Sequence, residues 1–436
     1  MKQITILGTG YVGLVSGACF AEIGNQVIYT DIDHARIARL QEGEVPFYEP
    51  GLKELVKRNT AEGRIRFTCD VAVAIAVSEI IFIAVGTPMS PSGEADLTHI
   101  RAAAQTIGEH LNGYKVIVNK STVPVGTGRW VHAVIQQHLK DPSIEFDVVA
   151  NPEFLREGSA IFDCMHMDRA IIGTASPQAS RIIEELHAPF GTTVFTTDRE
   201  SAEMIKYASN AFLATKISFI NAIAHICEGV DADVTKVAEG MGLDSRIGGK
   251  FLLAGLGFGG SCFPKDTHAI VHMAERVGYD FALMKAVIAT NDQQRLVIVR
   301  KLEDIFVEIQ GLNIAVLGLA FKPNTDDLRC APSLDIISVL LALGAVVWAY
   351  DPVALEGARK QLSEEVTLCD DVYETVMDCD ACLIVTEWNE VRNMDLAKVR
   401  NLMRTPIVID GRNCFGLEVM KSHGFIYHSI GRAVVE

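Results

Sequence analysis

The amino terminus carries the pattern that most restricts the fold of this chain. The apolar run Ile4–Leu7 leads into the turn Gly8–Gly13, whose sequence is Gly-Thr-Gly-Tyr-Val-Gly. An apolar helix is predicted next, and the following apolar run, Val27–Thr30, ends at Asp31. Continuous apolar runs of this length are typical of parallel strands that are buried on both faces. The order therefore predicts a strand–helix–strand unit of an α/β fold.

A second stretch repeats this order without the later glycines. Ile314–Leu317 runs into Gly318, a helix is predicted over about 333–343, and Ala345–Tyr350 ends at Asp351. Strands that alternate with helices predict two parallel sheets with helices on both faces. Further apolar runs that we predict as strands are Ile80–Val85, Val116–Val118, Asp147–Ala150, Ala381–Val385 and Ile407–Ile409.

The segment between these two halves has a different character. The stretch from about Asp198 to Gly229 has no proline and has glycine only at its last position, and its apolar residues recur at helical spacing, which predicts one long helix. A second helical stretch is predicted over 281–309. The predicted fold class is thus α/β, with two Rossmann-like parallel-sheet domains joined by a long central helix and a helical middle domain. The predicted domains are 1–197 for dinucleotide binding, 198–310 for the helical part and 311–436 for the second sheet.

Composition excludes several classes of protein. The 436 residues are 49% hydrophobic, which is enough to form hydrophobic cores and excludes a disordered chain. The net charge of −16 argues against a nucleic-acid binder or a polybasic membrane binder. We expect a cytoplasmic protein whose ten cysteines are mostly reduced, because neither a membrane-spanning run nor a signal peptide is recognised. The cysteine and histidine spacings predict no metal site.

The Gly8–Gly13 turn is the first candidate site. Glycines let the backbone approach a pyrophosphate, and the N-terminus of the next helix favours its negative charge. Asp31 would bind a ribose 2′-hydroxyl and repel a 2′-phosphate, which favours NAD over NADP. The alternative is a glycine turn that binds no ligand. Ligands of open α/β sheets lie at the carboxyl ends of strands, so the candidate walls are Gly86–Pro88, Lys120–Pro124 and Asn151–Glu153.

Cys262 lies in the most unusual cysteine context. The segment Gly255–Asp266 begins with four glycines in six residues, which suits close approach of the backbone to a ligand. A thiol has an ordinary pKa of about 8.5, and a nearby lysine and the N-terminus of the next helix would both lower it. Cys262 is therefore a candidate nucleophile. The alternative is a buried structural thiol in a tight turn.

Four further polar residues are less distinctive. Lys206 and Asn210 are four residues apart on the predicted long helix and share a face, although a lysine there is usually a solvated charge. Lys322 and Arg329 follow Gly318 near a strand end. They either hold phosphates by charge or are solvated loop cations.

These motifs occur in order along nearly the whole chain. By these motifs the chain resembles the nucleotide-sugar 6-dehydrogenases of the UDP-glucose/GDP-mannose dehydrogenase family. The resemblance implies NAD as cofactor, UDP-glucose as substrate, a homodimer through the long helix and a C-terminal domain that binds the UDP-sugar. The matching segments are Gly8–Gly13, Gly86–Pro88, Ser121–Gly126, Asn151–Gly158, Lys206–Ala211, Gly259–Asp266 and Gly318–Lys322.

The chemistry that the resemblance implies is a double oxidation. The C6 alcohol becomes an aldehyde, a cysteine thiolate captures it as a thiohemiacetal, a second oxidation gives a thioester, and water releases the carboxylate. Covalent capture keeps a free aldehyde from escaping between the two steps.

The resemblance also implies roles for individual residues. Cys262 is the nucleophile, Lys206 stabilises the oxyanions, and Glu153 is an acid–base carboxylate. Asp266, Thr122 and Asn210 hold or activate water. The implied cofactor contacts are Gly8, Gly10, Tyr11, Val12, Gly13, Asp31, Arg36, Thr87, Thr122, Glu157, Lys265 and Arg329. The implied substrate contacts are Glu153, Phe154, Leu155, Arg156, Glu157, Lys206, Asn210, Phe251, Leu252, Leu253, Ala254, Gly255, Gly259 and Lys322, together with Arg246, which would reach the substrate of the neighbouring subunit.

Two rival functions remain open. A sister enzyme acting on GDP-mannose or UDP-N-acetylmannosamine shares the same catalytic residues, although Phe251–Gly255 and Phe212–Lys216 look more like the UDP-glucose branch. A two-electron dehydrogenase of the 6-phosphogluconate type would need neither Cys262 nor the second sheet.

Overall fold

The structure is a computed structural model that describes residues 1–90 and 93–436. The chain forms two compact units, Met1–Ser209 and Asn210–Glu436, called here the N-terminal and C-terminal units. The boundary between them falls inside one long helix, α9 (Arg199–Gly229), which confirms the predicted continuous helix. The division into three domains at 197 and 310 stays a prediction.

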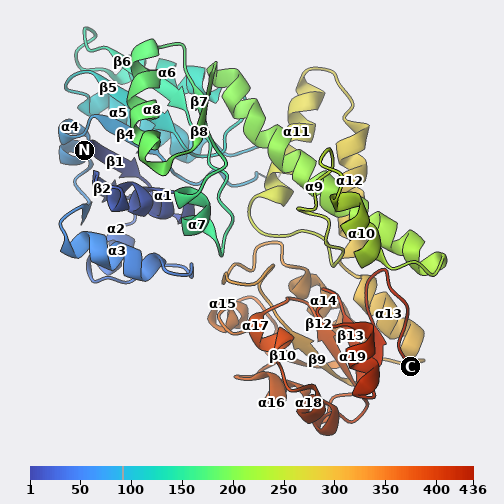
Figure 1. Ribbon diagram of the computed structural model, residues 1–436. Helices are drawn as coiled ribbons and strands as arrows, with labels where there is room; N and C mark the ends of the chain where they lie inside the picture. Colours follow the sequence, from blue (N-terminus) through green and yellow to red (C-terminus); the bar gives the residue numbers. More distant parts are fainter. Residues whose placement is uncertain (91–92) are drawn as a thin grey trace. The chain divides into compact units, whose positions relative to one another are not determined.

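The N-terminal unit is built on an eight-stranded sheet with the order β3-β2-β1-β4-β5-β6-β7-β8 (Figure 1). All neighbouring strands are parallel except β6 and β7. The strands are β1 (Gln3–Leu7), β2 (Gln26–Thr30), β3 (Ile65–Phe67), β4 (Ile80–Ile83), β5 (Lys115–Asn119), β6 (Phe146–Ala150), β7 (Arg169–Gly173) and β8 (Thr193–Thr197). The helices are α1 (Tyr11–Glu22), α2 (His34–Gln41), α3 (Leu52–Ala61), α4 (Val71–Val77), α5 (Thr98–His110), α6 (Thr127–His138), α7 (Ala160–Met165), α8 (Pro177–His187) and the 3-10 helix η1 (Ala188–Phe190).

Each face of this sheet has its own core. On one face, Ile80 and Phe82 of β4 pack in a cluster with α1, α3, α7 and α8, whereas Ile81 and Ile83 pack on the other face with α4, α5 and α6. The alternation follows from the two-residue period of a strand. The apolar runs predicted β1, β2, β4, β5 and β6 but not β3, β7 or β8. The reason is that β3 has three residues and most of β8 is exposed, so neither reads as a continuous buried run.

The C-terminal unit contains a second, wholly parallel sheet with the order β11-β10-β9-β12-β13-β14. Its strands are β9 (Asn313–Leu317), β10 (Val346–Tyr350), β11 (Thr367–Leu368), β12 (Ala381–Ile384), β13 (Ile407–Asp410) and β14 (Ile426–His428). Its helices, besides most of α9, are α10 (Val234–Gly242), α11 (Phe263–Arg276), α12 (Ala282–Gln294), α13 (Val297–Ile305), α14 (Pro332–Ala342), α15 (Leu355–Arg359), α16 (Val372–Val376), α17 (Asn389–Arg392), α18 (Leu396–Leu402) and α19 (Leu417–Ser422).

The predicted α/β class with two Rossmann-type sheets is confirmed. The helical stretch predicted over 281–309 consists of two helices, α12 and α13, which a break at 295–296 separates. No helix in the described part of the chain has the length and apolar character needed to cross a membrane. In both sheets the parallel strands β1, β4 and β5, or β9 and β12, end at one edge, and this edge is where a ligand of an open α/β sheet binds.

Candidate functional site

The glycine turn connects β1 to α1 and uses its glycines for two different purposes. Gly8 has φ +105°, and a Cβ there would lie 2.6 Å from the carbonyl oxygen of Ala84. A Cβ on Gly13 would collide with the Gly8 carbonyl oxygen, so both glycines are required for packing. Gly10 is different: it is the N-cap of α1, carries no side-chain cap, and has open space around its missing Cβ. The bare N-terminus of α1 therefore suits a pyrophosphate.

Asp31 lies beside this turn at the end of β2. Its Oδ2 accepts hydrogen bonds from the backbone N–H and the hydroxyl of Thr9, both at 2.7 Å, and Oδ1 accepts from the Asp33 N–H. Burial raises the pKa of Asp31, but the hydrogen bonds from Asp33 and Thr9 outweigh it and the pKa is lowered overall. Arg36 lies 3.8 Å away. The side chain keeps 10% exposure, so an ionised acceptor reaches the surface where a ribose would bind.

The loops that follow β4 and β5 are tied together. The Thr87 hydroxyl donates to the Thr122 carbonyl at 2.9 Å, and the Ser121 hydroxyl donates to the Val85 carbonyl at 2.7 Å. One step along the sheet, the buried Lys120 ammonium donates to the Asn151 side-chain carbonyl at 2.9 Å. The three loops predicted as candidate walls thus form one continuous edge of the sheet.

Lys206 is not a solvated charge. Its ammonium lies 3.0 Å from the Glu153 carboxylate, and each of these two side chains is only 4% exposed. Glu153 also accepts from the Leu155 N–H, and the Lys206 ammonium lies 5.3 Å from the Phe154 ring centroid. Removing one partner of such a buried ion pair is costly, because the other charge would remain desolvated. The arrangement places a carboxylate and a cation against the same loop.

Tyr11 and Glu157 belong to a neighbouring part of this edge. The Tyr11 hydroxyl donates to the buried Glu49 carboxylate, which also accepts from the backbone N–H groups of Gly158 and Ala160. Burial, and then the bond to Glu49, raises the pKa of Tyr11. Glu49 was not predicted from the sequence, because the backbone groups that it binds are more than 100 positions away. Arg156 pairs with Asp163 at 2.6 Å and is half exposed.

The C-terminal unit contains Cys262 as the N-cap of α11, so the helix N-terminus predicted after it is present. Its Sγ lies 3.6 Å from the Ser261 hydroxyl. One turn along, the buried Asp266 accepts from the Asn210 amide at 2.6 Å and from the Lys265 ammonium at 2.5 Å. Cys262 is partly exposed.

The glycine segment that leads to Cys262 is held by side-chain amides. The Asn221 carbonyl accepts from the Gly255 N–H and the Gln294 amide donates to the Gly255 carbonyl, at 2.8 and 2.7 Å. Asn291 bonds both the N–H and the carbonyl of Phe258. These three amides were not predicted, because nothing in a helical sequence distinguishes them from solvated polar residues. They fix the backbone that precedes the thiol.

The remaining predicted residues of this unit lie on loops. Arg329 and Arg246 are 63% and 87% exposed, and each pairs with a nearby aspartate, Asp327 and Asp244. The Lys322 ammonium lies 5.1 Å from the Phe321 ring centroid. Within Phe251–Gly255, Phe251 has φ +66°, Leu252 is buried and Leu253 is 83% exposed. The two exposed arginines are available to a ligand but do not identify one.

The predicted residues divide between the two units. The N-terminal unit contains Gly8, Gly10, Tyr11, Val12, Gly13, Asp31, Arg36, Thr87, Thr122, Glu153, Phe154, Leu155, Arg156, Glu157 and Lys206, and the C-terminal unit contains Asn210, Arg246, Phe251, Leu252, Leu253, Ala254, Gly255, Gly259, Cys262, Lys265, Asp266, Lys322 and Arg329. Within residues 1–90 and 93–436, no group of three or more histidine, cysteine, aspartate or glutamate side chains is placed to hold a metal ion.

Comparison with known proteins identifies relatives over the whole chain. Three models of the UDP-glucose/GDP-mannose dehydrogenase family match in order: the NAD binding domain at residues 2–191, the central domain at 200–293 and the UDP binding domain at 315–416. The chain is 61% identical to the UDP-glucose 6-dehydrogenase TuaD of Bacillus subtilis (strain 168) over 435 residues, which are 100% of this chain and 94% of that protein.

Solved structures agree with this assignment. The structure of a UDP-glucose dehydrogenase from the hyperthermophilic archaeon Pyrobaculum islandicum matches with a TM-score of 0.93 and 37% identity, covering 99% of this chain and 98% of that one. A UDP-D-ManNAc dehydrogenase from Pyrococcus horikoshii matches with a TM-score of 0.85 and 27% identity, covering 98% and 99%. The chain therefore belongs to the UDP-glucose/GDP-mannose dehydrogenase family of NAD-dependent enzymes.

Proposed function

We propose that this enzyme oxidises the C6 alcohol of UDP-glucose to the carboxylate of UDP-glucuronate, with two molecules of NAD reduced for each sugar. The observation that carries the proposal is Cys262, a partly exposed thiol at the N-terminus of α11 that is followed by the Asp266–Asn210 pair. A helix N-terminus favours the thiolate over the thiol. The high identity to a UDP-glucose 6-dehydrogenase supports UDP-glucose over the sister sugars.

The cofactor site fits NAD. Gly10 leaves the N-terminus of α1 open to a pyrophosphate, and Asp31 presents an ionised acceptor to a ribose. When bound, NAD accepts a hydride in each oxidation step. Thr87, Thr122, Glu157, Arg36, Lys265 and Arg329 are proposed as further cofactor contacts.

The proposed reaction begins when the C6 alcohol loses a proton and a hydride to give an aldehyde. The Cys262 sulfur then adds to the aldehyde carbon, and the resulting thiohemiacetal loses a second hydride and a proton to give a thioester. Water adds to the thioester carbon and the carbon–sulfur bond breaks, which releases the carboxylate and restores the thiol. One water is consumed and two hydrides leave.

The other catalytic residues have proposed roles that suit their surroundings. Lys206 stabilises negative charge on the C6 oxygen, which is worth most in a desolvated site. Glu153, paired with Lys206, moves the proton of that oxygen. Asp266 accepts from Asn210 and can also accept from a water, and Thr122 is proposed to hold the same hydrolytic water.

A homodimer is also proposed, through α9. Phe212, Phe219 and Ile226 follow each other at intervals of seven residues and are 65%, 48% and 58% exposed. A stripe of large apolar side chains at this spacing on one helix face is typical of an interface. Arg246 is proposed to reach the neighbouring site. Phe219→Glu is expected to shift the mass measured by light scattering from dimer to monomer, whereas Met204→Glu, an exposed position earlier on α9, is the control.

The stoichiometry of NADH tests the function. With limiting UDP-glucose, two NADH are expected for each sugar, and GDP-mannose and UDP-N-acetylmannosamine are the comparison substrates. One NADH with accumulated aldehyde would contradict the double oxidation. Cys262→Ser should still bind UDP-glucose in a calorimetric titration while losing turnover, and Cys69→Ser, at an exposed cysteine elsewhere, is the control.

A further inference from the structure

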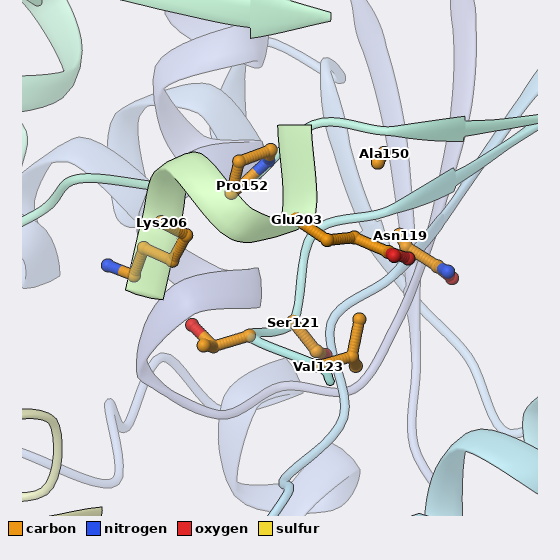
Figure 2. Close-up of a pocket in the computed structure, with 8 residues that line it drawn as sticks. Asn119, Ser121, Val123, Ala150, Pro152, Glu203 and Lys206 are labelled. Atoms are coloured by element: carbon orange, nitrogen blue, oxygen red, sulfur yellow. The ribbon is translucent and has the colours of Figure 1, made fainter. Parts of the chain in front are cut away.

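A small pocket lies at the carboxyl ends of β5 and β6 in the N-terminal unit (Figure 2). Its volume of about 10 Å³ is close to that required by a single water molecule. Two of its side chains, Glu203 and Lys206, come from the first turns of α9. The lining residues are Asn119, Ser121, Thr122, Val123, Ala150, Pro152, Glu203 and Lys206.

Asn119 lines this pocket with a side-chain amide that makes no hydrogen bond within the described part of the chain. The residue is 2% exposed, and neither its amide nitrogen nor its amide oxygen has a hydrogen-bond partner in the described protein. A buried donor or acceptor left in this condition is costly, and ordered water commonly satisfies such groups. The side chain therefore indicates a ligand that both donates and accepts hydrogen bonds.

Glu203 also lines the pocket. In Figure 2 the Glu203 side chain extends to the side on which Asn119 lies, whereas the Lys206 ammonium extends in the opposite direction. The carboxylate also binds the backbone at two points: Oε2 accepts from the Gly126 N–H at 2.6 Å and Oε1 accepts from the Gly128 N–H at 2.7 Å. These two hydrogen bonds are called the Glu203 clamp below. Gly126 is the N-cap of α6 and has no side chain to cap it, so Glu203 supplies the missing cap.

Both backbone positions that Glu203 binds, 126 and 128, favour glycine. Gly126 has φ +93°, and a Cβ on Gly128 would lie 3.2 Å from Oε1 of Glu203. The loop 120–126 is thus fastened at Ser121 to the Val85 carbonyl, at Thr122 to Thr87, and at its far end to Glu203. Lys206 lies three residues after Glu203 on α9. The hydrogen bonds of Glu203 therefore connect the loop that contains Thr122 to the helix that contains Lys206.

We propose that Glu203 is a positioning residue for the 120–126 loop, and that its carboxylate and the Asn119 amide together bind one buried water. The inference rests on the proposed function, because the role that it serves is the placement of Thr122 for the hydrolytic water. Glu203 acts through the loop backbone and touches neither substrate nor cofactor.

Kinetics of Glu203→Gln test the positioning role. The amide keeps the size of the side chain but can accept from only one of the two N–H groups, so the loop loosens at Gly126. We expect kcat to fall about tenfold while the KM for UDP-glucose changes less than about threefold, because a small misplacement costs more in the chemical step than in binding. The fraction of chains with a covalent sugar adduct on Cys262, measured by mass spectrometry after acid quench, should rise because hydrolysis slows.

Two variants control this experiment. Glu200→Gln removes a surface ion pair to Arg129 between the same two helices, α9 and α6, and should leave kcat and the adduct unchanged. Glu203→Asp keeps both acceptor oxygens on a shorter stem and should recover part of kcat. If Glu203→Gln and Glu200→Gln have the same kcat and the same adduct fraction, Glu203 is not a positioning residue.

Two measurements do not depend on catalysis. Amide hydrogen exchange of the peptide 120–128 should be faster in Glu203→Gln by about tenfold or more and unchanged in Glu200→Gln; equal exchange overturns the clamp even if the proposed reaction is correct. A crystal structure of the full chain should show one water within hydrogen-bond distance of both Asn119 and Glu203, and its absence overturns the water site. If the exchange result holds while wild-type enzyme forms one NADH per sugar, the proposed function fails and the clamp stands.

Discussion

The two units begin their sheets with the same backbone arrangement. In the N-terminal unit Gly8 follows β1 and Asp31 follows β2; in the C-terminal unit Gly318 follows β9 and Asp351 follows β10. The N–H of each glycine donates to the carbonyl of the residue before the aspartate, at 2.9 and 2.8 Å. Both glycines have positive φ, +105° and +93°. The strand orders, β3-β2-β1-β4-β5-β6 and β11-β10-β9-β12-β13-β14, also correspond.

The two aspartates differ in how much of their hydrogen-bonding capacity remains. Asp351 is fully buried, and its carboxylate accepts five bonds from its own unit, from the N–H groups of Leu319, Ala320, Val353 and Ala354 and from the Trp388 indole. Asp31 accepts three hydrogen bonds, two from Thr9 and one from the Asp33 N–H, and its side chain reaches the surface. The same position thus serves as a structural anchor in one unit and as a candidate ligand acceptor in the other.

The largest effect is expected from Asp351→Ala. Five buried donors would lose their acceptor, so we expect the free energy of unfolding of the C-terminal unit to fall by about 5 kcal/mol. Asp31→Ala should cost less, about 2 kcal/mol, since only three donors lose their acceptor, two of them on the buried Thr9. Urea unfolding followed by tryptophan fluorescence measures both, because Trp348 and Trp388 are in the C-terminal unit and Trp130 in the N-terminal unit. Equal losses would contradict the comparison of the two aspartates.

Alanine at the glycines separates packing from ligand binding. Gly8→Ala places a Cβ 2.6 Å from the Ala84 carbonyl oxygen at positive φ, and should destabilise the N-terminal unit by about 3 kcal/mol. Gly10→Ala meets nothing within 4 Å and should leave stability within about 0.5 kcal/mol of wild type. Its NAD affinity, measured by calorimetric titration, should nevertheless fall about tenfold or more, because the methyl group covers the α1 N-terminus. Unchanged NAD affinity would refute that role of Gly10.

Glu203 accepts two backbone hydrogen bonds, and its own titration gives a prediction for the pH dependence of stability. Burial raises the pKa of Glu203 to about 7, from an ordinary 4.5, although the Gly128 and Gly126 amides lower it; Glu200 raises it further and Arg199 lowers it. Since the folded chain holds the proton more tightly, this contribution to stability is fully present below pH 4.5 and is lost as the pH rises through 7. Wild type should therefore lose about 3 kcal/mol relative to Glu203→Gln over this window. If the free energies of unfolding of the two proteins changed in parallel with pH, this prediction would be wrong.

The smallest effect concerns cofactor choice. Asp31→Ala removes the acceptor for a ribose 2′-hydroxyl and the charge that repels a 2′-phosphate. The ratio of kcat/KM for NAD to that for NADP should fall about tenfold, which corresponds to about 1.4 kcal/mol. Asp33→Ala, at the neighbouring exposed aspartate, is the control and should keep the wild-type ratio.

The sequence predicted features that depend on consecutive residues. Buried strands such as β1 and β9 appeared as apolar runs, and the Gly8–Gly13 turn and Asp31 appeared at fixed spacing, because these patterns follow from local geometry. Cys262 was distinguished by the glycines before it. Lys206, by contrast, looked like a solvated charge on its own sequence, and its role came from the resemblance alone.

The sequence by itself determined the α/β class, the two strand–helix–strand openings and the family, since each depends on the order of residue types along the chain. Only the tertiary structure decided which polar residues anchor the backbone. Glu49, Glu203 and Asp351 bond backbone groups that are remote in sequence, and Asn119 became informative only when the fold buried it without a partner. Hydrogen-bond satisfaction is a property of spatial neighbours, so no local pattern encodes it.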